Sequence, residues 1–121
     1  MSKFKLKARI KSFYFAGRGI AYMMQSQHNA WIHALGTLMA IALGFICKLQ
    51  TIDWCIILLA IMAVWTAETL NTALEFLADV TSPNFHPLVA KAKDVAAGAV
   101  LITAICAGII ALIIFLPYLR A

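Results

Sequence analysis

Three long apolar stretches divide the chain into segments of membrane-spanning length. They cover residues 29–47, 52–67 and 95–119. A helix needs about 20 apolar residues to cross a hydrocarbon layer of about 30 Å, and a lipid-exposed span satisfies its backbone groups as a helix. The pattern therefore predicts an all-α integral membrane protein of one domain, residues 1–121, with three transmembrane helices. We expect these helices at residues 28–48, 52–80 and 88–119.

The N-terminal segment has a different pattern. Residues 3–11 alternate basic and apolar side chains, K-F-K-L-K-A-R-I-K. A period of two is typical of a strand, but a lone strand at a membrane cannot satisfy its backbone hydrogen bonds. We therefore expect an interfacial segment over about residues 1–25 that contains an amphipathic helix, with its long basic side chains reaching toward the head groups.

Composition and charge support a membrane protein and suggest its orientation. The chain is 64% hydrophobic and 12% charged, too apolar for a soluble domain of 121 residues. Six of the ten basic residues precede the first span: Lys3, Lys5, Lys7, Arg9, Lys11 and Arg18. Because positive charge favours the cytoplasmic side, this end is expected in the cytoplasm, together with the connection between the second and third spans. An anionic leaflet accounts for the net charge of +5, and no nucleic-acid partner is expected.

Four polar side chains follow one face at the end of the second predicted span. At about 100° per residue, Glu68, Asn71, Glu75 and Asp79 fall within an arc of about 80°. An ionised side chain at mid-membrane costs about 2.5 to 3.5 kcal/mol on insertion scales, and less near the boundary. Glu75 and Asp79 alone would suit a solvated helix end, but Glu68 and Asn71 lie too early in the sequence for that interpretation. The face is therefore the predicted working surface.

The third span begins after a helix-breaking segment and carries basic residues. Residues 81–87 include two prolines, which end the second helix. Lys91 and Lys93 are about 200° apart on the third helix, so one of them is expected to face the acidic side chains. The three cysteines have no C-x-x-C spacing, and we expect neither disulfides nor a metal site from them.

Two motifs resemble a known family. Glu68-x-x-Asn71-Thr72-Ala-x-Glu75-x-x-x-Asp79, and Ala92-Lys93-Asp94-x-Ala96-Ala97-Gly98-Ala99-Val100 after His86, are similar to segments of the small bacterial diacylglycerol kinases and undecaprenol kinases. The resemblance implies a homotrimer in the bacterial inner membrane, with the N-terminus and active site on the cytoplasmic side. It also implies transfer of the γ-phosphoryl group of ATP, with Mg²⁺, to the hydroxyl of a membrane lipid.

Position by position, the resemblance assigns roles to individual residues. It implies that Glu68 is the catalytic base, Glu75 a magnesium ligand and Lys93 a contact to the ATP phosphates. Asn71, Asp79, His86 and Asp94 match nucleotide-site or supporting positions. The chemistry agrees, because Mg²⁺ prefers carboxylate and phosphate oxygens and phosphoryl transfer depends on positioning and charge neutralisation. No glycine-rich phosphate loop is present, which argues against a P-loop enzyme.

One position departs from the family pattern. The family has a metal-binding glutamate before the first span, in a Glu-x-Asn-x-x-x-His arrangement, and here the matching segment runs from Gln27 to His33. Glutamine keeps a carbonyl oxygen but lacks the negative charge, so metal affinity and activity are expected to fall. Gln27 is thus the second predicted metal position, in an enzyme that is either active or catalytically impaired and limited to binding ATP and lipid.

The sequence gives a slight preference for one lipid substrate, and it allows one further function, that of a structural or transport subunit. Asn29-x-x-Ile32-His33 and the run from Ala96 to Ala99 slightly favour undecaprenol over diacylglycerol. A structural or transport subunit, with the acidic face lining an ion path, would place its acids near mid-membrane, whereas Glu75 and Asp79 lie beyond the expected boundary. A lipid kinase acting on a lipid alcohol is therefore the favoured hypothesis.

Overall fold

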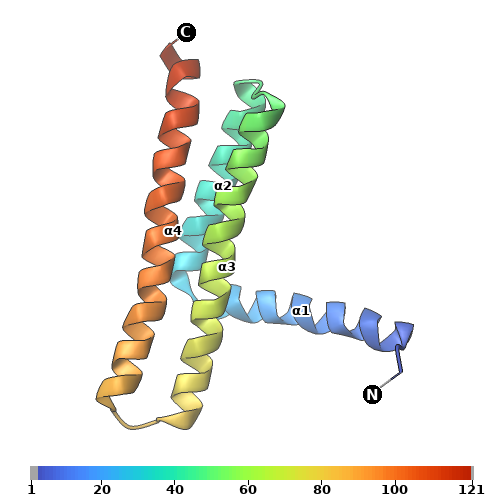
Figure 1. The fold of residues 1–121 in the computed structure, drawn as a ribbon, viewed down its shortest axis with the longest axis vertical. Coiled ribbons are helices and arrows are strands. Elements are labelled where there is room, and N and C mark those ends of the chain that lie inside the picture. The colour runs from blue at the N-terminus through green and yellow to red at the C-terminus, as the bar shows by residue number, and fades with distance from the viewer. Residues whose placement is uncertain (1–2, 121) are drawn as a thin grey trace.

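The computed structural model describes residues 3–120 and contains four helices (Figure 1). They are α1 (Leu6–Ser26), α2 (His28–Ile46), α3 (Thr51–Thr81) and α4 (Pro87–Arg120). Three of them, α2, α3 and α4, are long and apolar enough to cross a membrane. The all-α membrane fold predicted from the sequence is confirmed. Each of these helices begins and ends within one or two residues of its expected range.

The long helices differ in how far they extend. The 19 residues of α2 span about 28 Å, close to the thickness of a hydrocarbon layer of about 30 Å. The 31 residues of α3 and 34 of α4 span about 46 and 51 Å and therefore exceed it. The lower ends of α3 and α4 project as a hairpin past the point where α2 begins (Figure 1). Asp79, two residues before the end of α3, belongs to this projection, whereas Glu75 contacts Gln27 at the start of α2.

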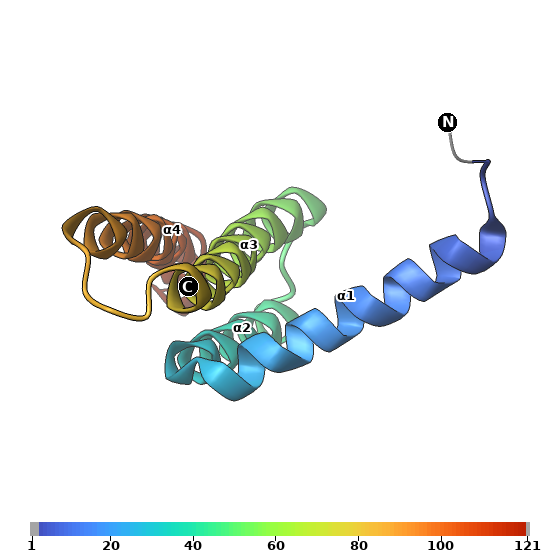
Figure 2. The ribbon, with the colours of Figure 1, turned by 90° about the horizontal axis from the view of Figure 1, so that it is seen from below.

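The first helix leaves the bundle at a steep angle (Figures 1 and 2). The alternating segment 3–11 is helical from Leu6 onward, as expected from the cost of an unpaired strand at a membrane. Gln27 separates α1 from α2 with an extended backbone, φ −115° and ψ 114°. Met23 is buried where α1 meets the bundle. Gln27 thus occupies the corner at which the chain turns from α1 into the membrane-spanning bundle.

The apolar core lies at the opposite end of the bundle from this corner. Leu49, Ile57, Ile114 and Phe115 form a buried cluster, and the Tyr118 hydroxyl donates a hydrogen bond of 3.0 Å to Asp53 beside it. A Cβ added to Gly44 would lie 2.5 Å from the Trp54 ring, so the close approach of α2 to α3 requires glycine there. These contacts fix the far end of the three long helices.

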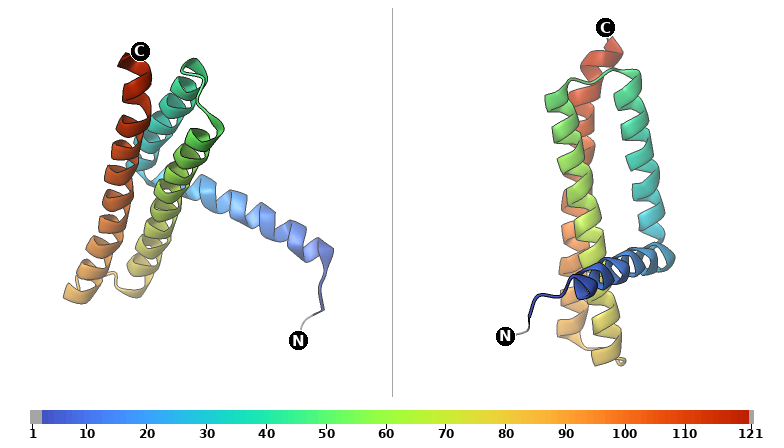
Figure 3. Two further views of the ribbon diagram at one scale, coloured as in Figure 1. Left: turned by 45° about the horizontal axis from the view of Figure 1, so that its top comes forward. Right: turned by 90° about the vertical axis from the view of Figure 1, so that its right-hand side faces the viewer.

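The three long helices do not pack on one another equally. Helices α3 and α4 run side by side over most of their length (Figures 1 and 3), and α3 packs more extensively on α4 than on α2. Large apolar side chains stay exposed on each of the three helices, among them Leu38, Leu59 and Leu112. Such a surface suits contact with lipid or with other helices rather than with water.

Candidate functional site

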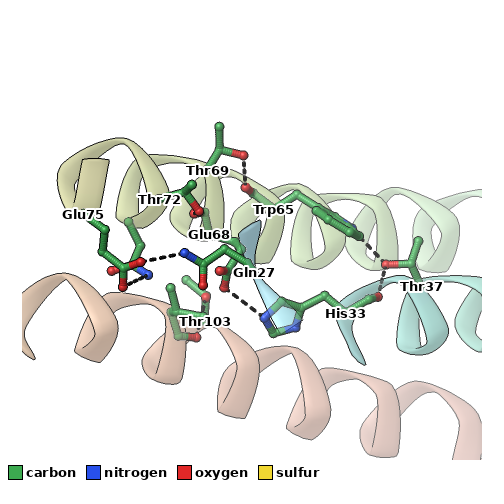
Figure 4. A network of polar contacts seen from close by, with 11 residues as sticks. Gln27, His33, Thr37, Trp65, Glu68, Thr69, Thr72, Glu75 and Thr103 are labelled. Atoms are coloured by element: carbon green, nitrogen blue, oxygen red, sulfur yellow. Dashed lines mark hydrogen bonds and ion pairs between the residues drawn. The ribbon is translucent and has the colours of Figure 1, made fainter. Parts of the chain in front are cut away.

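The first part of the candidate site joins the corner residue to α3. Gln27 Nε2 donates a hydrogen bond of 2.6 Å to Glu75 Oε2, although the two residues lie 48 positions apart in the sequence. Asn71 Nδ2 donates a longer bond of 3.5 Å to Glu75 Oε1. Two amide groups therefore hold the Glu75 carboxylate (Figure 4). The structure brings together three of the predicted site residues here: Gln27, Asn71 and Glu75.

The second part is a buried carboxylate. Glu68 is 1% exposed, and its Oε2 lies 3.3 Å from His33 Nε2 on α2 (Figure 4). This contact is an ion-pair distance and not a formed hydrogen bond, and no other group among residues 3–120 bonds to His33 Nε2 or to either Glu68 oxygen. A buried charge without a partner is costly. The carboxylate is therefore built into a place where it needs either His33 or an arriving ligand.

The backbone and ring of His33 are held from two helices. The Thr37 hydroxyl donates to the His33 carbonyl at 2.7 Å and accepts a hydrogen bond of 2.9 Å from Trp65 Nε1. The Trp65 and His33 rings meet edge to face, with centroids 6.2 Å apart. Trp65 precedes Glu68 by one turn of α3. The residue that packs on His33 and the carboxylate that His33 approaches therefore lie next to each other on α3.

The third part lies in the projecting hairpin. Lys93 Nζ donates to Asp79 Oδ1 at 2.9 Å, so Lys93 is the lysine that faces the acidic residues, as the helical spacing predicted for one of the pair. His86 Nδ1 accepts a hydrogen bond of 3.1 Å from the Leu88 backbone at the start of α4. A cavity of about 470 Å³ is lined by Asp79, His86 and Lys93. The Asp79–Lys93 pair is exposed, so it contributes little to stability and is accessible to a ligand.

Asp94 has an exposed side chain that makes no hydrogen bond or ion pair, to these groups or to any other, in the described part of the chain. Across residues 3–120, no group of three or more His, Cys, Asp or Glu side chains is arranged to hold a metal ion. The acidic face of α3 is instead graded, from buried Glu68 and Asn71, through half-buried Glu75, to exposed Asp79.

Sequence reasoning missed His33 as part of the site. It entered the sequence analysis as the last residue of the Glu-x-Asn-x-x-x-His arrangement and as part of the segment that favours undecaprenol, but with no role in the site. A further signal was available, because His33 and Thr37 are four residues apart in an otherwise apolar helix and so lie on the same face. Two polar side chains stacked on one face of a membrane span indicate a specific partner on a neighbouring helix.

Comparison with known proteins identifies the family. Residues 14–115 match the sequence profile of the prokaryotic diacylglycerol kinases, which is most of the chain. The chain belongs to the prokaryotic diacylglycerol kinase family. The family resemblance inferred from the two motifs is therefore confirmed, and the protein is a lipid kinase of the membrane. A lipid kinase of this family uses ATP as its phosphate donor.

Relatives within the family carry two different names. The chain is 42% identical over 115 residues to an undecaprenol kinase of Bacillus subtilis, covering 95% of this chain and 94% of that protein. It is 38% identical over 107 residues to a diacylglycerol kinase of Synechocystis, covering 88% of this chain and 61% of the relative. A Helicobacter pylori diacylglycerol kinase is 28% identical over 109 residues, covering 84% and 85%. The family is therefore shared by kinases named for different lipids.

Proposed function

We propose that this protein transfers the γ-phosphoryl group of ATP to the hydroxyl of a membrane lipid alcohol, with undecaprenol favoured over diacylglycerol. The observation that carries the proposal is the buried Glu68 carboxylate, neither of whose oxygens has a hydrogen-bond partner among the described residues. An acceptor buried without a partner, near the expected membrane boundary, is suited to receive a proton from a lipid hydroxyl.

An apolar cavity supports a lipid as the acceptor. It measures about 300 Å³, lies between α2, α3 and α4, and has His33 and Val64 at the end nearest Glu68. Small residues line much of the rest, including Ala60, Ala104 and Gly108. A hydrocarbon chain in this cavity would place its polar end beside His33 and Glu68. Ligand sites are typically apolar cavities with a few converging polar groups, and this one has that composition.

The proposed reaction is a direct displacement. The lipid oxygen attacks the γ-phosphorus of ATP, its proton passes to Glu68, and the bond to the β-phosphate oxygen breaks to release ADP. Lys93, in the exposed cavity with His86, would neutralise phosphate charge. Asp79 now holds Lys93 at 2.9 Å, so phosphate would compete with Asp79 for the ammonium. The proposed contribution of Asn71 is to orient Glu75.

Magnesium would bind at Glu75 and Gln27. Mg²⁺ is usually held by one or two carboxylates together with substrate phosphates and waters, and Glu75 with the Gln27 carbonyl oxygen fits that pattern. When bound, Mg²⁺ supplies positive charge to the transferring phosphate. Glu75 and Gln27 would offer one carboxylate instead of two, because position 27 is a glutamine, and the Gln27 amide that now donates to Glu75 would have to turn its carbonyl oxygen toward the metal. We therefore propose that metal affinity and turnover are reduced relative to a chain with glutamate at position 27.

Undecaprenol is favoured for two reasons. The segments Asn29-x-x-Ile32-His33 and Ala96 to Ala99 slightly favour that lipid. The relative named undecaprenol kinase is also similar over nearly its whole length. Diacylglycerol is the alternative substrate, supported by the names of the Synechocystis and Helicobacter relatives.

The proposed assembly is a homotrimer in the bacterial inner membrane, with the N-terminus and the α3–α4 hairpin in the cytoplasm. The excess of basic residues before the first span supports this orientation. Exposed apolar residues on α3, among them Met62 and Leu70, line a groove with small residues of α4. Small residues allow close helix approach in membranes, so the groove is suited to a helix of another copy. Asp94 is proposed to support the nucleotide from its exposed position on α4.

A radiochemical assay tests the proposal. Purified protein is incubated with Mg²⁺, ATP labelled at the γ-phosphate and an equimolar mixture of undecaprenol and diacylglycerol, and the lipids are separated by thin-layer chromatography. We expect label mainly on undecaprenol. Label mainly on diacylglycerol would reverse the lipid preference. ATP binding with no labelled lipid would instead favour the catalytically impaired alternative that the Gln27 position suggests.

A further inference from the structure

We propose that His33 is a positioning residue for Glu68: its imidazole Nε2–H holds one carboxylate oxygen and so directs the other toward the acceptor hydroxyl. This inference rests on the proposed function, because it concerns the group that accepts the proton. The relevant contact is the distance of 3.3 Å between His33 Nε2 and Glu68 Oε2. This is just beyond the range of about 2.7–3.2 Å that is usual for N–H···O hydrogen bonds, so a small shift of either side chain would form one.

Burial makes this partner important. The side chains of Glu68 and His33 are only 1% and 13% exposed, so water contributes little at the carboxylate. The other ion pair in the described part of the chain joins Lys93 to Asp79, and no lysine or arginine lies within 4 Å of Glu68. His33 is therefore the basic group available to the buried carboxylate. Its hydrogen bond to Oε2 would offset part of the cost of burying the charge.

The surroundings of His33 restrict its movement. Thr37 and Trp65 hold its carbonyl and ring from α2 and α3, at the distances given above (Figure 4). A ring fixed from two helices can fix the carboxylate that it contacts. Positioning of a reacting group within a fraction of an ångström has large effects on rate, which gives this arrangement a function beyond packing.

The His33 ring lies between the proposed lipid cavity and the Glu68 carboxylate. His33 both lines the apolar cavity and contacts Glu68. Neither Glu68 oxygen has a hydrogen-bond partner among residues 3–120, and Oε2 is the oxygen that lies 3.3 Å from His33 Nε2. A bond from His33 to Oε2 would thus leave Oε1 free to accept. A lipid hydroxyl at the His33 end of the cavity would therefore find Oε1 available as the proton acceptor. His33 itself exchanges no proton in this scheme.

Two substitutions of matched chemistry test the role. In His33→Gln the amide nitrogen reaches about as far as Nε2, whereas in His33→Asn it ends at the level of Nδ1 and cannot reach Glu68. We expect His33→Asn to lower kcat for lipid phosphorylation about 10- to 100-fold, the loss expected for a hydrogen bond to a charged group, with KM for ATP unchanged. His33→Gln should recover most of that loss. Equal kcat in His33→Asn and the unaltered protein would overturn the proposal, as would equal losses in the two folded variants.

Nitrogen-15 spectra of the histidine side chains give a second readout that needs no turnover. In Glu68→Leu, the His33 Nε2 signal should move while those of His28 and His86 stay in place. An unchanged His33 signal in a folded Glu68→Leu protein would overturn the contact. If the unaltered protein phosphorylates no lipid alcohol, the proposed function fails, and these spectra still decide whether His33 holds Glu68.

Discussion

Gln27 donates a hydrogen bond of 2.6 Å to Glu75, and this bond joins the corner between α1 and α2 to the acidic face of α3. A glutamate at position 27 would place two carboxylates at this distance. Like charges so close repel strongly unless a cation lies between them. Gln27 therefore allows the corner between α1 and α2 to bond to α3 without a metal ion. The same residue lowers the expected affinity for a metal ion, because it lacks the negative charge of glutamate.

The Gln27→Glu variant should reverse this balance. We expect its kinase activity to saturate at lower Mg²⁺ concentration and to reach a higher maximum than that of the unaltered protein. In a chelator its stability should fall by about 1 to 3 kcal/mol, because a hydrogen bond to a charged group is lost. Magnesium titrations of activity and thermal unfolding with and without chelator measure both effects. Coincident magnesium curves would count against a metal role for position 27.

Lys93→Met should weaken nucleotide binding with little effect on the lipid. Its ammonium lies in the exposed cavity of the α3–α4 hairpin, where ATP phosphates are proposed to bind. We expect a higher KM for ATP and an unchanged KM for lipid in steady-state kinetics. Lys91→Met is the matched control, because Lys91 points about 200° away around α4. An equal rise of the KM for ATP in both variants would show that the effect comes from lost surface charge and not from a nucleotide site at Lys93.

Gly108→Leu should block the apolar cavity. A side chain at Gly108 meets nothing within 4 Å at its Cβ, so the backbone accommodates it and the added atoms occupy the cavity that Gly108 lines. The KM for the lipid alcohol should rise while the KM for ATP stays constant. Ile109→Phe enlarges the next residue, which is 51% exposed, and serves as the control. An unaltered lipid KM in Gly108→Leu would place the lipid elsewhere.

Tyr118→Phe separates stability from catalysis. The Tyr118 hydroxyl bonds to Asp53 beside the apolar cluster, at the end of the bundle far from Glu68. Removing the hydroxyl should lower the unfolding midpoint in detergent and leave kcat and both KM values unchanged. A selective loss of kcat would show that the two ends of the bundle are coupled.

The sequence predicted the helices and the acidic face because both depend on local periodicity. Apolar runs of membrane length gave the spans, and a spacing of three and four residues placed Glu68, Asn71 and Glu75 together. Prolines at the hairpin gave the end of α3. Helical spacing alone left Lys91 and Lys93 as candidates for the lysine that faces the acidic residues. The structure shows that it is Lys93, which bonds to Asp79.

The contacts of His33 and Gln27 could not be predicted in this way. The His33 contact depends on how α2 lies against α3, and the Gln27 contact depends on the extended backbone between α1 and α2. Periodicity within one helix carries no information about such contacts. For Asp94 the structure adds no contact, since its side chain is exposed, and its role in the site stays a prediction from the motif.

The most direct test of the account compares Glu68→Gln with the unaltered protein. Glutamine keeps the size of the buried side chain but cannot accept the proton in the same way. We expect formation of phosphorylated lipid to fall about 100- to 10,000-fold, with ATP binding and the unfolding midpoint retained. If Glu68→Gln phosphorylates lipid at the unaltered rate, Glu68 is not the base, and the account of the site is contradicted.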